Sequence, residues 1–226
     1  MAGLTLFNIS LTILIYIGAR GLYRNITSPF TTPVLLATII VIIVLRAADI
    51  TYVEYTPAKE SLTYLLGPAT VALAVPMYKN RLVIKEKGLQ VLSGLMLGCF
   101  ATIASAIWIS KLLNFSEIIQ RTSAVKAVTT PVAIEIVTII GGDPSLAAVL
   151  VITAGIFGAA FGSLLLTLFK IHDPISRGLG IGTVSHGIGT SQAAAEGTLQ
   201  GAVSSVAIGA AAILTSIILP IIYNLL

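Results

Sequence analysis

The sequence predicts an all-α polytopic membrane protein, built as a single integral membrane domain over residues 1–226. Composition is the first reason: 56% of the residues are hydrophobic and only 10% are charged, whereas a soluble domain carries roughly 25% charged residues. The second reason is a series of apolar runs close to the roughly 20 residues that a helix needs to cross the hydrocarbon core. These runs are longer and more uniformly apolar than the strands of an outer-membrane barrel.

About seven or eight transmembrane helices are expected from the length of these runs. The run 61–78 contains Gly67, Pro68 and Pro76, so a kink is expected there. One further segment, 115–142, is amphipathic and is interrupted by Pro131. The uncharged or nearly uncharged runs cover residues 4–19, 33–48, 61–78, 88–110, 144–169, 178–195 and 197–226.

The basic residues are confined to short loops between the apolar runs. The formal net charge is +4, but no contiguous basic face exists, which argues against nucleic-acid binding. The loops around Arg20, at 79–87 and at 170–177 would all lie in the cytoplasm under the positive-inside rule. That assignment fails if segment 115–142 crosses the membrane once. We therefore predict that this segment is re-entrant, or consists of two half-helices that meet at its Thr-Thr-Pro sequence.

Two stretches of the chain resemble each other. Residues 31–42 read TTPVLLATIIVI and residues 129–140 read TTPVAIEIVTII. The charge pattern places the first Thr-Thr-Pro near the cytoplasm and the second near the outside. An inverted repeat of roughly 1–110 and 111–226 is therefore predicted, which is a common plan of secondary transporters.

A first polar group surrounds the proline of segment 115–142. A helix that restarts after Pro131 directs free N–H groups toward the break, where they favour an anion. Lys126 could pair with a carboxylate there, and Thr129 and Thr130 add hydroxyl groups. Glu135 is a candidate for proton or cation coupling, because ionisable groups inside membrane segments are usually functional. The structural alternatives are an interfacial Lys126 and a Glu135 that pairs with a basic residue at a helix contact.

A second polar group lies inside the run 178–195. Its glycines allow the backbone to leave the helical region and approach a ligand. His186 can donate a hydrogen bond or change its charge near neutral pH, so it is both a binding and a coupling candidate, although a single histidine is more often structural. The candidate binding residues in this group are Ser185, His186, Gly187, Gly189 and Thr190.

Other classes of function have little support in the sequence. There is no Walker loop for ATP hydrolysis, and His172 and His186 lack zinc-ligand spacing with carboxylates. Gly94-x-x-x-Gly98 and Gly158-x-x-x-Gly162 indicate close helix packing and suggest a homodimer. Glu196 is expected only to mark the water interface. We expect no enzyme activity, no cofactor and no bound metal.

The segments KAVTTPVAIE, IGG, SHGIGTS and EGTLQGAVSSVA together resemble the LrgB family over nearly the whole chain. That family includes the CidB proteins and the carboxyl-terminal part of the plant plastidic glycolate/glycerate translocator. Its signatures map to Lys126, Ala127, Val128, Thr129, Thr130 and Pro131, and to Ser185, His186, Gly189 and Thr190. One departure is Gln192, since many relatives have a basic residue shortly after the Gly-Thr.

The resemblance implies two alternative functions in the plasma membrane of a bacterium. One is a carrier for small monocarboxylates such as pyruvate, glycolate, glycerate or lactate, in which Lys126 and helix N-termini hold the carboxylate. Thr129, Thr130, Ser185 and His186 would then contact the rest of the substrate. The other is an antiholin-like regulator of murein hydrolase activity and cell lysis, which acts through a small LrgA/CidA-type membrane partner.

Overall fold

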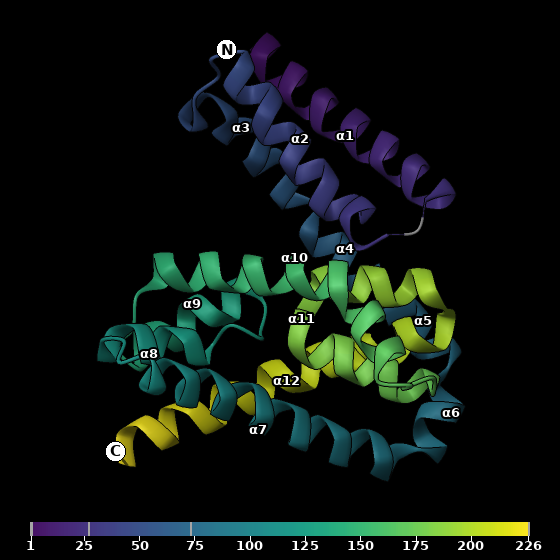
Figure 1. Cartoon of the computed structure of the whole chain (residues 1–226), viewed down its shortest axis with the longest axis vertical. Helices are drawn as coiled ribbons and strands as arrows, with labels where there is room; N and C mark the ends of the chain where they lie inside the picture. The colour runs from purple at the N-terminus through teal and green to yellow at the C-terminus, as the bar shows by residue number, and fades with distance from the viewer. Residues whose placement is uncertain (1, 27, 73, 226) are drawn as a thin grey trace. The chain divides into compact units, whose positions relative to one another are not determined.

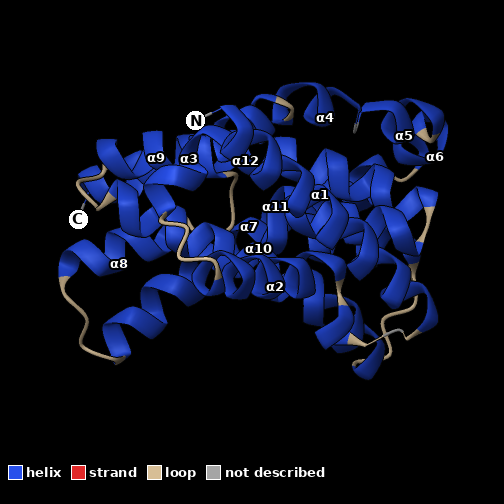
Figure 2. Cartoon of the chain, turned by 90° about the horizontal axis from the view of Figure 1, so that it is seen from above, coloured by secondary structure: helices blue, strands red, loops and turns tan. Residues whose placement is uncertain are grey.

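The computed structural model describes residues 2–26, 28–72 and 74–225, and every secondary-structure element in these ranges is helical. Figure 2 shows the helices joined by short loops. The chain divides into two compact units, and the first unit ends at Ala72. The single domain over 1–226 and the inverted repeat with a boundary near residue 110 stay predictions.

The first unit is formed by α1 and the shorter helices that pack against it. Ala37 and Val41 of α2 and Ala58 of α3 are buried in it. The hydroxyls of Thr12 on α1 and Tyr55 on α3 lie 3.0 Å apart. The elements of this unit are α1 (Ala2–Asn25), η1 (Pro29–Thr31), α2 (Pro33–Ala47), α3 (Tyr52–Tyr64) and α4 (Leu66–Ala72).

The second unit is organised around α10, which runs from α9 to α11 in Figure 1. Its helices α7, α11 and α12 also pack against one another. The elements are α5 (Ala74–Lys79), α6 (Arg81–Glu86), α7 (Gly88–Leu112), α8 (Glu117–Ala124), α9 (Thr130–Ile139), α10 (Pro144–Leu168), α11 (Pro174–Glu196) and α12 (Thr198–Leu225).

Four of the described helices are long and apolar enough to cross a membrane, fewer than the seven or eight expected. They cover Gly3–Asn25, Gly88–Leu112, Pro144–Leu168 and Thr198–Tyr223. The run 61–78 is not one continuous helix, because α3 ends at Tyr64 and α4 begins at Leu66. Gly67 and Pro68 directly follow this break, whereas the lack of charge had suggested a crossing. The run 178–195 also fails to cross, for the reason given below.

The amphipathic segment 115–142 folds back on itself as a helical hairpin, here called the first hairpin (α8, the turn Val125–Thr129, and α9). The guanidinium of Arg121 donates a 2.7 Å hydrogen bond to the carbonyl oxygen of Ile140, 19 residues away. A continuous helix would separate these residues by about 28 Å. The segment therefore has the form of two half-helices, one of the two forms expected from the positions of the basic loops.

The helix α11 is a second hairpin. The Nε of Arg177 lies 2.9 Å from Oε2 of Glu196, again 19 residues apart. The backbone reverses at His186, whose φ of 41° and ψ of −137° are non-helical. Each arm, Pro174–Ser185 and Gly187–Glu196, is about 15–18 Å long, roughly half the 30 Å thickness of the hydrocarbon core.

The two hairpins attach to opposite ends of α10. At the base of the first hairpin, the hydroxyl of Thr122 accepts a 2.9 Å hydrogen bond from the backbone N–H of Asp143, which caps the start of α10. At the base of the second, Arg177 donates to the hydroxyl of Thr167 near the end of α10. Because α10 has 25 residues and is about 37 Å long, the bases of the two hairpins are separated by about the thickness of a bilayer along this helix.

The second and third basic loops lie together. Lys87, which precedes α7, and Asp173, which caps α11, line a common cavity of about 340 Å³. The backbone N–H and the hydroxyl of Ser176 hold the pKa of Asp173 below its ordinary value, and the charge of Lys87 lowers it further. The loops 79–87 and 170–177 therefore share one side of the second unit, as the positive-inside rule requires once segment 115–142 turns back.

Candidate functional site

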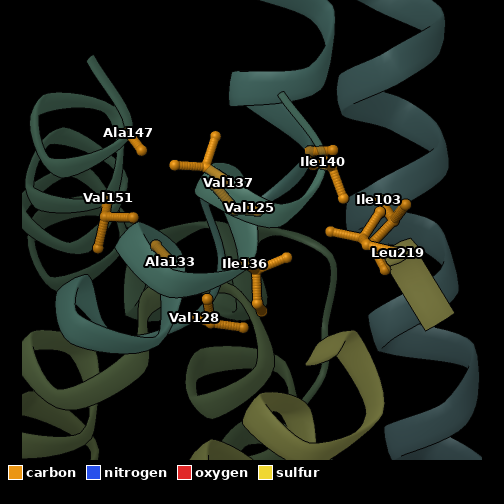
Figure 3. Close-up of a cluster of buried hydrophobic side chains, with 11 residues drawn as sticks. Ile103, Val125, Val128, Ala133, Ile136, Val137, Ile140, Ala147, Val151 and Leu219 are labelled. Atoms are coloured by element: carbon orange, nitrogen blue, oxygen red, sulfur yellow. The ribbon is translucent and has the colours of Figure 1, made fainter. Parts of the chain in front are cut away.

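The tip of the first hairpin is held by buried valines on either side of Lys126. Val125 and Val128 are almost completely buried in an apolar cluster with residues of α7, α9, α10 and α12, as Figure 3 shows. The second half-helix begins at Thr130 with Pro131 in its first turn, where a missing N–H costs nothing. Val125 and Val128 therefore anchor the turn, and Lys126 between them lies outside the cluster.

Lys126, at the tip of the first hairpin, is a cation with few partners. Its Nζ donates one hydrogen bond, 3.2 Å long, to the backbone carbonyl of Thr102 on α7. No carboxylate of the described residues lies within 4.0 Å of it. An ammonium group has three donors, so two remain available. An uncompensated charge in this environment is costly, and an anionic ligand would relieve that cost.

The tip of the second hairpin docks against glycines of α10. The Nε2 of His186 lies 2.8 Å from the carbonyl oxygen of Val151. A Cβ at Gly155 would come within 2.7 Å of this nitrogen, so only glycine permits the ring to sit there. Ser185 packs directly on Gly158, where a Cβ would lie 2.6 Å from the serine Cβ. Both tip residues therefore meet the middle of α10.

A cavity of about 610 Å³ runs along α10 and the first arm of the second hairpin, and both hairpin tips contribute to its wall. Its polar side chains are Lys126, Thr153 and Ser185. The hydroxyl of Ser185 has no hydrogen-bond partner among the residues described here. The other lining residues are Leu150, Ala154, Phe157, Gly158, Gly162, Leu165, Leu166, Gly180, Ile181 and Val184.

Only two of the binding residues predicted from sequence line this cavity, namely Lys126 and Ser185. Thr129 and Thr130 are half-buried. The predicted residues that do not line the cavity are Thr129, Thr130, Pro131, His186, Gly187, Gly189 and Thr190. The two tips are brought to one cavity, but most of their polar side chains face neighbouring helices.

His186 and Thr190 take part in a buried network outside the cavity. The hydroxyl of Thr190 donates to the carbonyl oxygen of His186 over 2.9 Å and lies 2.6 Å from the hydroxyl of Ser204 on α12. These contacts join the second arm of the hairpin to its own tip and to α12. Glu135, the other coupling candidate, lies on the exposed surface of α9 and does not line the cavity.

Sequence reasoning missed the contribution of α10. Thr153 lines the cavity, and Gly158 receives the second tip. Gly158 and Gly162 had been interpreted as a packing motif that suggests a homodimer, and the structure places Gly158 against its own chain. A run of small residues beside a predicted break was the available signal. The homodimer itself stays a prediction.

Comparisons with known proteins point to one family. The model of the LrgB-like family matches residues 12–225. The uncharacterized protein YwbG of Bacillus subtilis is 34% identical over 91% of each chain. The uncharacterized protein YxaC of the same organism is 33% identical over 95% of this chain and 93% of its own. The antiholin-like protein LrgB of Bacillus mycoides is 28% identical over 84% of this chain and 82% of its own. No solved structure matches.

Proposed function

Because the chain belongs to the LrgB-like family, we propose that this membrane protein is a carrier for small monocarboxylates of the pyruvate, glycolate, glycerate or lactate type in the bacterial plasma membrane. The single observation that carries the proposal is Lys126. Its ammonium lines an otherwise largely apolar cavity together with the unpartnered hydroxyl of Ser185. One cation and a small number of hydroxyls match the chemistry of a singly charged, partly polar anion.

The two hairpins suggest how the binding site could be exposed alternately to the two sides of the membrane. Discontinuous helices that meet near the bilayer midplane form the substrate sites of many secondary transporters, and relative movement of their bundles exposes the site to each side in turn. Here one tip is anchored to the apolar cluster of the first hairpin and the other rests on glycines of α10. Separation of α10 from the second hairpin would open the cavity. Coupling through Glu135 or His186 stays a prediction.

Uptake into proteoliposomes tests the proposal. Purified protein should exchange labelled pyruvate or glycolate with saturable kinetics. Lys126→Gln removes a charge-assisted hydrogen bond worth about 1.5–3 kcal/mol, so the substrate Kd should rise about 10- to 150-fold. Lys111→Gln, at an exposed lysine in the last turn of α7, is the matched control and should exchange normally. Equal exchange by both variants would contradict the assignment of Lys126.

A second candidate function is regulation of murein hydrolase activity and lysis through an LrgA/CidA-type partner. The printed name of the Bacillus mycoides relative, antiholin-like, favours it. Glu135 adds a structural reason, because an exposed carboxylate on a membrane-embedded hairpin needs a polar partner outside the second unit. This candidate predicts stable co-purification with such a partner and a lysis phenotype that Lys126→Gln leaves intact. A carrier predicts that the same variant loses exchange.

A further inference from the structure

A second buried cation lies at the base of the second hairpin, where Arg177 pairs with Glu196. The side chains are only 12% and 15% exposed, and Nε and Oε2 are 2.9 Å apart. The other carboxylate oxygen of Glu196 accepts a hydrogen bond from the hydroxyl of Ser163 on α10. The remaining guanidinium nitrogens of Arg177 donate to the carbonyl oxygens of Ser163 and Ile171 and to the hydroxyl of Thr167. This ion pair therefore joins both arms of the hairpin to α10.

Arg177 and Glu196 do not line the cavity of about 610 Å³, but residues close to them do. The wall includes Gly162, which precedes Ser163 on α10, and Gly180, which lies one turn after Arg177 on α11. The tip that carries Lys126 packs near the other half of α10, in the cluster that contains Val151. Arg177, which donates to the carbonyl oxygen of Ser163, is therefore a cation placed beside the part of the cavity wall nearest the basic loop 170–177.

We propose that Arg177 is the second anion-binding residue of the path, and that the carboxylate of Glu196 occupies its guanidinium until a substrate carboxylate replaces it. This inference rests on the proposed carrier function. The guanidinium fork suits a carboxylate, and one carboxylate is already bound there. A buried arginine without a counter-ion is strongly disfavoured. The base of the hairpin would therefore stay closed unless a second carboxylate is present, which links opening to the presence of substrate.

The test measures binding of pyruvate to the full-length protein in detergent by its thermal stabilisation. Glu196→Gln removes the competing carboxylate and leaves Arg177 uncompensated, so the Kd for pyruvate should fall about tenfold. The double variant Arg177→Gln, Glu196→Gln removes both charges, and its Kd should rise to the wild-type value or above. Glu196→Asp, which shortens the carboxylate, should shift the Kd in the same direction as Glu196→Gln but less.

The matched control is Glu117→Gln at the base of the first hairpin. This variant removes the carboxylate that pairs with Arg121, and the side chain of Glu117 is 73% exposed. It should leave the Kd for pyruvate unchanged. A purely structural ion pair predicts that Glu196→Gln lowers thermal stability without changing the Kd, and equal Kd values for Glu196→Gln and the double variant would overturn the inference. The proposed function fails instead if the wild-type protein neither binds nor exchanges any of the short monocarboxylates.

Discussion

His186 gives the sharpest test of the second hairpin, because its backbone conformation reverses the usual preference for alanine over glycine. In a continuous helix, glycine is less stable than alanine by about 1 kcal/mol. At φ 41° and ψ −137° a residue with a Cβ is strained, and such strain costs about 1–3 kcal/mol. Glycine adopts this conformation freely. His186→Gly should therefore be more stable than His186→Ala by about 1–3 kcal/mol.

The comparison between the two variants cancels the contacts that both of them lose. Each removes the 2.8 Å hydrogen bond from the ring to Val151, which contributes about 0.5–1.5 kcal/mol, and each removes the packing of the ring on Gly155. The difference between the variants therefore reports the backbone alone. The wild-type protein should be more stable than His186→Ala. The difference in stability between the wild-type protein and His186→Gly should be smaller, because glycine relieves the backbone strain at this position.

The assay is equilibrium unfolding in mild detergent micelles, with the free energy of unfolding compared at one detergent concentration. Ala195→Gly, at an exposed helical position in the second arm, is the control and should destabilise by about 1 kcal/mol in the ordinary direction. If His186→Ala is as stable as His186→Gly, or more stable, the chain continues as a helix through residue 186. The second hairpin and the cavity built on it would then be wrong.

Two further predictions concern the docking of the second hairpin and its cap. Gly158→Ala places a Cβ 2.6 Å from that of Ser185, so it should lower the free energy of unfolding by about 1–3 kcal/mol in the same assay. The control is Gly209→Ala on α12, whose Cβ would meet nothing within 4 Å, and it should raise the free energy of unfolding by up to about 1 kcal/mol. Equal effects of the two variants would contradict docking at Gly158. Asp173 has a folded-state pKa below its ordinary value of 3.8, so its stabilisation is present above that value and is lost as the pH falls through the folded pKa. Asp173→Asn keeps a capping group but has no carboxyl to protonate, so the free energy of unfolding should fall less steeply below about pH 4 than in the wild-type protein. The same pH dependence in both proteins would contradict this role of Asp173.

The sequence predicted where the helices break because the residues that break them act locally. Pro131 is suited to the first turn of a new helix, and the glycines and hydroxyls around His186 make a reversal possible. The sequence also predicted that segment 115–142 turns back, because a single crossing by this segment would have placed the basic loops on opposite sides of the membrane. Both arguments depend on neighbours in the chain or on the sum of charges, and neither requires knowledge of which helices touch.

The direction in which each break turns could not be predicted in the same way. A kinked helix and a hairpin have the same local composition, and the hairpin in α11 is shown by the reversal at His186 and by the contact of Arg177 with Glu196, 19 residues apart. Sequence reasoning did not anticipate that Glu196, expected only to mark the water interface, pairs with Arg177. Similarly, Thr129 and Thr130 lie beside the break but outside the cavity, because the buried valines of the tip fix which side chains face it.

The placement of charge favours a transport function over a purely structural one. A scaffold could use α10 and its neighbours without any ionisable group at the hairpin tips, because apolar side chains would cost less in hydrocarbon. Lys126 is instead kept at a tip with one carbonyl partner and no counter-ion among the described residues. Arg177, one turn before the cavity-lining Gly180, is fully paired. An unpaired cation in the cavity and a paired one beside it differ in a way that packing does not require, and exchange of a carboxylate between them would use that difference.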